Sequence, residues 1–255
     1  MKVKKILAPG LVLLAGLAGY VLRQRELSSG FDEAGLNVPS QDARLLVALS
    51  IAVTVLALIY ALTRKAQPAW DKTFPRNPAL ALVRMLSGAA LAGGSVIALS
   101  EGGGRFALLV ALLGIAAGAC QLANDALYYQ GKPPQPYAEL VPVVYLICLL
   151  IYHFRSWSID PVVLDYCFRL FALIGTLAGV FALGGYAFDR GRRGSVCLFC
   201  ALGAYFCILS LADGGTAQML IFAACALRLL IGLFCAAGAK PAPEEPEAGE
   251  SPENA

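Results

Sequence analysis

The sequence is poor in charged residues, and this shortage excludes most kinds of soluble protein. Asp, Glu, Lys and Arg together make up 15% of the 255 residues, whereas a typical soluble domain has about 25%. The hydrophobic fraction is 58% and the mean hydropathy is +0.69. A chain this apolar also lacks the polar composition that keeps a segment disordered. The composition is typical of a protein whose surface faces lipid.

Side chains for metal binding and catalysis are equally scarce. His153 is the single histidine and has no companion at the spacing of metal ligands. The motifs G-x-S-x-G, H-E-x-x-H and G-x-x-x-x-G-K-[ST] do not occur, and neither does a nucleic-acid-binding motif. We therefore expect no metal, no other cofactor and no nucleic-acid partner, and the sequence gives little support for an enzyme.

Long apolar runs dominate the chain instead. A helix needs about 20 mostly apolar residues to cross the hydrocarbon core of a bilayer, and eight segments qualify. Strand-like alternation is absent, so we predict an all-α, polytopic transmembrane bundle of about eight spans. The predicted spans are Ile6–Leu22, Ala43–Leu62, Ala79–Ser100, Phe106–Tyr129, Leu140–Phe154, Val163–Phe188, Val196–Ala212 and Ala217–Ala239.

The distribution of basic residues predicts the orientation of these spans. With the N-terminus inside, twelve Lys and Arg lie on the cytoplasmic side, five lie on the opposite side and three fall inside spans, which accounts for all twenty. Cytoplasmic loops carry the excess of positive charge. We therefore expect a multi-pass protein of the plasma membrane with both termini in the cytoplasm.

The two ends of the chain differ in character. Basic residues at positions 2 to 5 precede an apolar run that ends at Leu22, and Arg23 follows this run. This pattern is typical of an uncleaved signal anchor. At the other end, the segment from Pro241 to Ala255 carries five Glu among Pro, Gly and Ser. We predict a transmembrane domain over residues 1–239 and a disordered acidic tail over residues 240–255.

Arg228 is the most informative single residue. It is the twelfth residue of the last predicted span, Ala217–Ala239, and would lie near the middle of the bilayer. An arginine there costs about 2.5–3.5 kcal/mol on insertion scales, and such residues usually face the bundle interior and mark a ligand or ion path. The sequence shows no acidic partner at the same depth. We therefore expect Arg228 to bind an anion; a purely structural arginine that reaches backbone carbonyls or the headgroups is the other interpretation.

Two further arginines lie about a third of the way into their spans. Arg169 shares a helix face with Thr176 and Gly179, and Arg84 shares one with Gly88 and Ser95. Small residues at this spacing first indicate close helix packing. We also include Arg169, Arg84 and Thr176 among the candidate substrate-binding residues.

The fourth span adds an amide and a carboxylate to this set. Gly114, Gly118, Gln121 and Asp125 recur at spacings of four, three and four, so they share one face. Asp125 is either a solvated carboxylate at the helix end or, if it turns inward, the counter-charge of Arg84. Gln121 and Asp125 complete the candidate binding residues.

Cys197 and Cys200 form a C-x-x-C motif near the start of the seventh predicted span. Backbone N–H groups at a helix start can activate such a thiol. The motif resembles that of the membrane-embedded thiol oxidoreductases of the vitamin-K-epoxide-reductase type, which implies a redox role for both cysteines. Those enzymes carry a second pair that faces the oxidising side, whereas this pair is predicted to be cytoplasmic and no second C-x-x-C exists.

These features lead to three functional hypotheses. The first is a membrane protein that binds, and moves, a small anionic or amphipathic solute or a lipid headgroup at Arg228. The second is a non-catalytic scaffold or partner subunit whose small-residue faces serve association with another membrane protein. The third is a thiol oxidoreductase that uses Cys197 and Cys200.

Overall fold

Eight long helices form the described part of the chain. The computed structural model describes residues 2–29, 40–64, 73–74, 77–157 and 166–238. Within these residues there are only helices and connecting turns, and eight helices are long and apolar enough to cross a membrane, as predicted. They are α1 (Lys2–Ser29), α2 (Gln41–Leu62), α4 (Pro78–Ser100), α5 (Arg105–Gln130), α6 (Pro136–Trp157), α7 (Cys167–Gly184), α8 (Arg193–Leu209) and α9 (Thr216–Gly238). Short 3-10 turns, η2 (Gly185–Phe188) and η3 (Ser210–Ala212), extend α7 and α8.

Local signals set several of the helix ends. The Ser40 side chain accepts a hydrogen bond from the Ala43 amide and caps α2, and Asn77 caps α4 directly before Pro78. Gly131, with φ of 77°, ends α5 in the left-handed conformation that favours glycine. The predicted tail from residue 240 lies outside the described residues.

Several helices extend beyond the predicted spans, among them the first and the fifth. The first span was expected to end at Leu22, but α1 continues to Ser29, because Arg23 and Glu26 pair with each other and are buried. The fifth span was expected to begin at Leu140, but α6 begins at Pro136. Proline is favoured in the first turn of a helix, where its missing N–H has no partner to lose.

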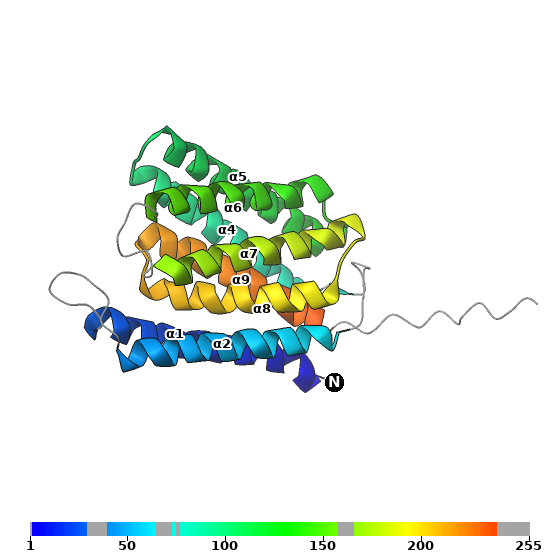
Figure 1. Cartoon of the computed structure of the whole chain (residues 1–255). Coiled ribbons are helices and arrows are strands. Elements are labelled where there is room, and N and C mark those ends of the chain that lie inside the picture. Colours follow the sequence, from blue (N-terminus) through cyan, green and yellow to red (C-terminus); the bar gives the residue numbers. More distant parts are fainter. Residues whose placement is uncertain (1, 30–39, 65–72, 75–76, 158–165, 239–255) are drawn as a thin grey trace, which may run out of the picture.

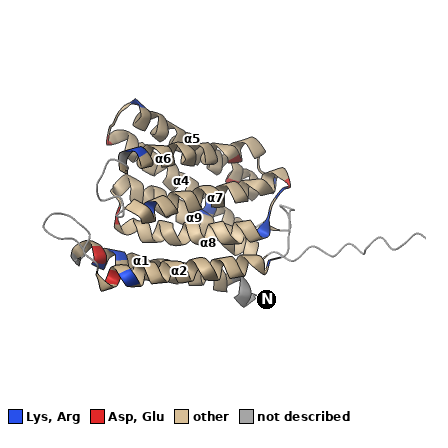
Figure 2. Cartoon of the chain, in the orientation of Figure 1, with Lys and Arg blue, Asp and Glu red and all other residues tan. Residues whose placement is uncertain are grey.

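Successive helices run in opposite directions, so each end of the bundle gathers one set of helix termini (Figure 1). We call the end where α1 begins and α9 ends the terminal side, and the opposite end the far side. Charged residues gather mainly at these two ends, and most of the helix length is uncharged (Figure 2). Such a distribution fits an apolar belt that faces lipid between two polar surfaces. The sides of the membrane to which the two ends belong remain a prediction.

Helices α8 and α9 form the centre of the bundle. Of the 18-residue apolar stretch in each of these helices, 67% is buried inside the structure, against 17% in α1 and 22% in α2. Helix α9 packs on α1, α4, α7 and α8, whereas α5 and α6 are not among its main packing partners. The space between α9 and the α5–α6 pair is therefore bridged by side chains.

Glycines allow the closest helix contacts, which confirms the packing interpretation of the small-residue faces. A Cβ built on Gly118 of α5 would lie 2.7 Å from the carbonyl oxygen of Gly88 in α4. A Cβ on Gly175 of α7 would lie 2.8 Å from the Cα of Gly203 in α8. Such approaches are tighter than side chains tolerate, so α4–α5 and α7–α8 depend on these small residues.

Gly118→Ala is expected to lower the free energy of unfolding by about 1–3 kcal/mol, because the added methyl group forces α4 and α5 apart. Unfolding of the purified protein in mixed detergent micelles would measure the loss. Gly93→Ala is the matched control, because a Cβ there meets only Leu220, at 3.7 Å. Equal stability of the two variants would show that the α4–α5 contact is looser than described.

Candidate functional site

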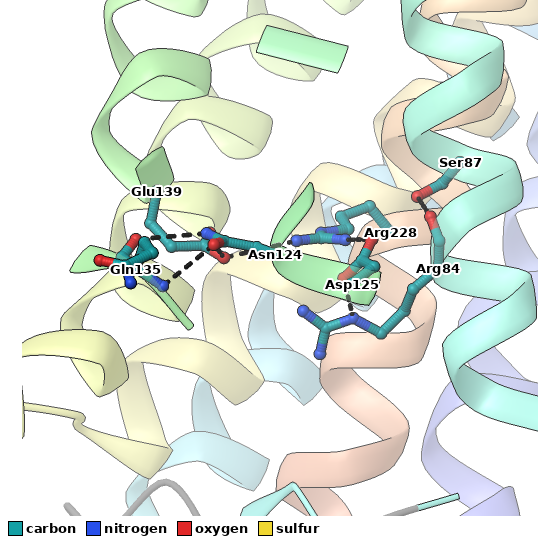
Figure 3. A network of polar contacts seen from close by, with 7 residues as sticks. All are labelled: Arg84, Ser87, Asn124, Asp125, Gln135, Glu139 and Arg228. Carbon is teal, nitrogen blue, oxygen red and sulfur yellow. Dashed lines mark hydrogen bonds and ion pairs between the residues drawn. The ribbon is translucent and has the colours of Figure 1, made fainter. Parts of the chain in front are cut away.

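Two arginines from different helices share one buried carboxylate. Asp125 of α5 is fully buried, and its Oδ1 accepts a hydrogen bond of 2.7 Å from Nε of Arg84 in α4. Its Oδ2 accepts a hydrogen bond from Nη1 of Arg228 in α9. Both arginine side chains are only 7% exposed. Asp125 therefore turns inward as the counter-charge of Arg84, and it joins α4, α5 and α9 (Figure 3).

A second carboxylate lies on the other side of Arg228. Oε1 of Glu139, in the first turn of α6, is 3.7 Å from Nη2 of Arg228, an ion pair longer than a hydrogen bond. The same oxygen accepts a hydrogen bond of 3.0 Å from the side-chain amide of Asn124. The side-chain oxygen of Asn124 in turn accepts a hydrogen bond of 3.0 Å from the backbone N–H of Gln135. Asn124 thus positions Glu139 by tying it to the α5–α6 turn (Figure 3).

The expectation that Arg228 lacks an acidic partner is wrong. Asp125 and Glu139 both face it, although each lies much nearer to a helix end in the sequence. The long arginine side chain covers the difference in depth. Together the two arginines and two carboxylates form a charge-balanced group when all four are ionised. We call Arg84, Asp125, Glu139 and Arg228 the Arg228 cluster.

Arg228 lines two small voids. One, the Glu139 void, is lined by the following residues: Phe74, Arg84, Glu139, Leu183, Arg228, Ile231 and Gly232. The other, the Gln121 void, is lined by Leu91, Gln121, Pro142, Tyr145, Leu146, Val180, Ala224, Cys225 and Arg228. Each has a volume of about 10 Å³, which is close to the smallest space that holds a water molecule. Helix α6 contributes Glu139 to the first void and Pro142, Tyr145 and Leu146 to the second.

Gln121 and Arg228 meet at the same void, as the binding hypothesis needs, but Thr176 and Arg169 lie elsewhere. The Thr176 hydroxyl is 3.0 Å from the sulfur of Cys207 in α8, within hydrogen-bond reach, so it contributes to α7–α8 packing. Arg169 donates a hydrogen bond to the backbone oxygen of Asp213. It therefore lies on the far side, away from the cluster.

The surroundings of Arg169 form a second ionic group. Nε of Arg23 in α1 is 2.8 Å from Oδ1 of Asp213, and Nη1 of Arg23 is 2.9 Å from Oε2 of Glu26. Nε of Arg169 is 3.8 Å from Oδ2 of Asp213. This group joins α1 and α7 to the turn between α8 and α9. Because these contacts connect helix ends, the group has a structural role.

Cys197 and Cys200 are both buried and present as free thiols. Helix α8 begins at Arg193, earlier than the predicted Val196, so Cys197 lies beyond the first three amides of the helix. The activation expected from a helix start is therefore absent. Arg193 extends the helix because its side chain caps α9, with Nε 2.7 Å from the Ala236 oxygen and Nη2 3.1 Å from the Ala237 oxygen. The redox role itself remains a prediction.

Sequence reasoning missed Glu139, Asn124 and Asp213 as interior groups. A usable signal existed for Glu139, because Pro136 followed by an acidic residue within one turn is typical of a helix start. Asn124 directly precedes Asp125, and its sequence context gives no further sign of its role. Asp213 begins the helix-breaking segment Asp213-Gly214-Gly215, and nothing in this context indicates burial.

Comparison with known proteins gives no independent assignment for this site. No protein-family model, curated protein or solved structure matched the chain.

Proposed function

We propose that this membrane protein binds a small anionic solute at Arg228, between α4, α5, α6, α7 and α9. The observation that carries the proposal is the setting of the guanidinium. Arg228 is buried, it bridges helices that do not pack closely on each other, and it lines two voids. Arginine is suited to this task because its planar donors bind carboxylate-like and phosphate-like groups in pairs.

A visiting anion has to compete with the resident carboxylates, and Glu139 is the one it replaces. Asp125 is held by hydrogen bonds from two arginines, whereas Glu139 faces Arg228 across 3.7 Å and accepts its short hydrogen bond from Asn124. The charged groups that face Glu139 are Arg228 and, across the Glu139 void, Arg84. Among the described residues, no titratable side chain of α7 lines that void; the contribution of α7 is Leu183.

When the Glu139 side chain moves away from Arg228, the cluster holds two arginines against one carboxylate, and an incoming anion restores the balance. Each void of about 10 Å³ holds about one water molecule, so a small anion also needs the space that the Glu139 carboxylate leaves.

Movement of the solute, location in the plasma membrane and cytoplasmic termini belong to the same proposal. An ionisable group deep in a span is commonly part of a solute or ion path. The excess of basic residues assigned to the terminal side supports cytoplasmic termini.

Arg228→Gln tests the binding step and is expected to abolish stabilisation by anions. The probes are acetate, nitrate and inorganic phosphate, added to detergent-purified protein at constant ionic strength and slightly acidic pH. A ligand at 100 times its Kd stabilises the native state by about 2.7 kcal/mol, which thermal unfolding detects. The matched control is Arg105→Gln, which removes an exposed arginine at the start of α5. Stabilisation of both variants to the same extent, or of neither wild type nor control, would contradict the proposal.

A non-catalytic scaffold is the second candidate, and the charge balance of the Arg228 cluster favours it. A group with equal numbers of arginines and carboxylates can hold α4, α5, α6 and α9 together without a ligand. In that case Arg228→Gln lowers stability equally with and without added anion. The same measurements therefore separate the two candidates.

A further inference from the structure

The voids around Arg228 are part of a longer series through the bundle. A larger cavity of about 110 Å³ lies toward the far side, where it includes the exposed residues Glu101 and Gly102 of the α4–α5 turn. Polar side chains line much of it: Ser95, Glu101, Tyr145, Tyr152, His153 and Gln218. We call it the far-side cavity. Its volume is enough for several water molecules.

Neighbouring members of this series share a wall residue. Tyr145 lines both the far-side cavity and the Gln121 void. Arg228 lines both the Gln121 void and the Glu139 void. The three spaces therefore follow one another from the far side to the Arg228 cluster, and Tyr145 is the first side chain that separates them.

Tyr145 is held firmly in this position. Its side chain is 1% exposed, and its hydroxyl is hydrogen-bonded to Ser95 of α4. A Cβ on Gly114 of α5 would lie 2.7 Å from the Tyr145 ring and would overlap the Ser95 hydroxyl. Gly114 thus provides the space that lets Tyr145 and Ser95 meet across the route.

We infer that a small anion reaches Arg228 from the far side, through the far-side cavity and the Gln121 void, and that Tyr145 closes this route. The inference rests on the proposed function, which identifies the solute as an anion. Tyr145 is the candidate closure because its side chain lines both the far-side cavity and the Gln121 void. The polar wall of the far-side cavity keeps the entrance hydrated, and Gln121 and Arg228 supply polar contacts beyond the ring.

Cys225 provides a native reporter, because it lines the Gln121 void beyond Tyr145. The protein in lipid nanodiscs is treated with the anionic thiol reagent 2-sulfonatoethyl methanethiosulfonate, and modification of each cysteine is followed by peptide mass spectrometry. We expect Cys225 to be protected in the wild type. In Tyr145→Ala, its modification rate should rise at least tenfold.

Tyr152→Ala is the matched control. Tyr152 lies two turns along the same helix and lines the far-side cavity, but not the Gln121 void. The Tyr152→Ala substitution removes the same atoms but leaves Tyr145 in place, so Cys225 should stay protected. Equal modification of Cys225 in both tyrosine variants, or protection in both, would overturn the inference.

A second measurement covers the case in which Tyr145→Ala does not fold. In otherwise unchanged protein, Gln218→Cys places a thiol in the far-side cavity and Gln121→Cys places one beyond Tyr145. The inference requires modification at position 218 to be at least tenfold faster than at position 121. Equal rates, or faster reaction at 121, would contradict it. If anions stabilise the protein but this pattern fails, the entry route is wrong; if the pattern holds without anion binding, the proposed function is wrong.

Discussion

Asp125→Asn is expected to lower the free energy of unfolding by about 3–5 kcal/mol, the usual cost of removing one partner from a buried ion pair. The substitution keeps the size of the side chain and removes its charge. Arg84 and Arg228 both lose their shared carboxylate, and the cluster gains a net positive charge far from water. Reversible unfolding in mixed detergent micelles, followed by circular dichroism, would measure the change.

Asp189→Asn is the control for this substitution. Asp189 is exposed in the turn after η2 and has a positive φ of 54°, which asparagine tolerates well, so little loss of stability is expected. The double variant Asp125→Asn, Arg84→Gln should lose less than the sum of the two single variants, because it removes one arginine together with the carboxylate it needs. Additive losses would mean that the pair does not interact as described.

Glu139→Gln is expected to have the opposite effect on anion binding to that of Arg228→Gln. Removing the carboxylate that faces Arg228 leaves a permanent vacancy for the anion, so affinity for acetate or nitrate at neutral pH should rise at least about tenfold, or ~1.4 kcal/mol. Because the two substitutions remove opposite charges at the same site, Arg228→Gln should abolish anion binding under the conditions in which Glu139→Gln strengthens it. Anion titrations of both variants, followed by thermal unfolding, would show the difference.

The amide that Glu139→Gln introduces can still form a hydrogen bond with Asn124, so the α5–α6 turn should persist. Asp189→Asn again serves as the control, since it removes one negative charge from the terminal side at an exposed position. Unchanged affinity in Glu139→Gln would show that Glu139 is not the group that the anion replaces. Weaker binding would show that Glu139 contributes to the ligand site directly.

The fold class could be predicted because it depends on local properties of the chain. A run of about 20 apolar residues has to form its backbone hydrogen bonds within itself when it enters a bilayer, so composition alone predicts eight helices. The small-residue faces that contain Gly118 and Gly179 also predicted close contacts, since only small residues permit them. The prediction failed mainly at the helix ends. There, Glu26 pairs with Arg23 and Glu139 pairs with Arg228, and both carboxylates are buried.

The cluster itself was decided by tertiary structure. The sequence alone indicated Arg228, Arg84 and Asp125 as candidate binding residues, because the cost of burying a charge depends on depth in the apolar run. It could not show that all three meet, or that Glu139 joins them while Arg169 and Thr176 lie elsewhere. Partner choice depends on how α5, α6 and α9 are placed around α4, and this placement brings together Asp125 and Arg228, which lie 103 positions apart in the chain.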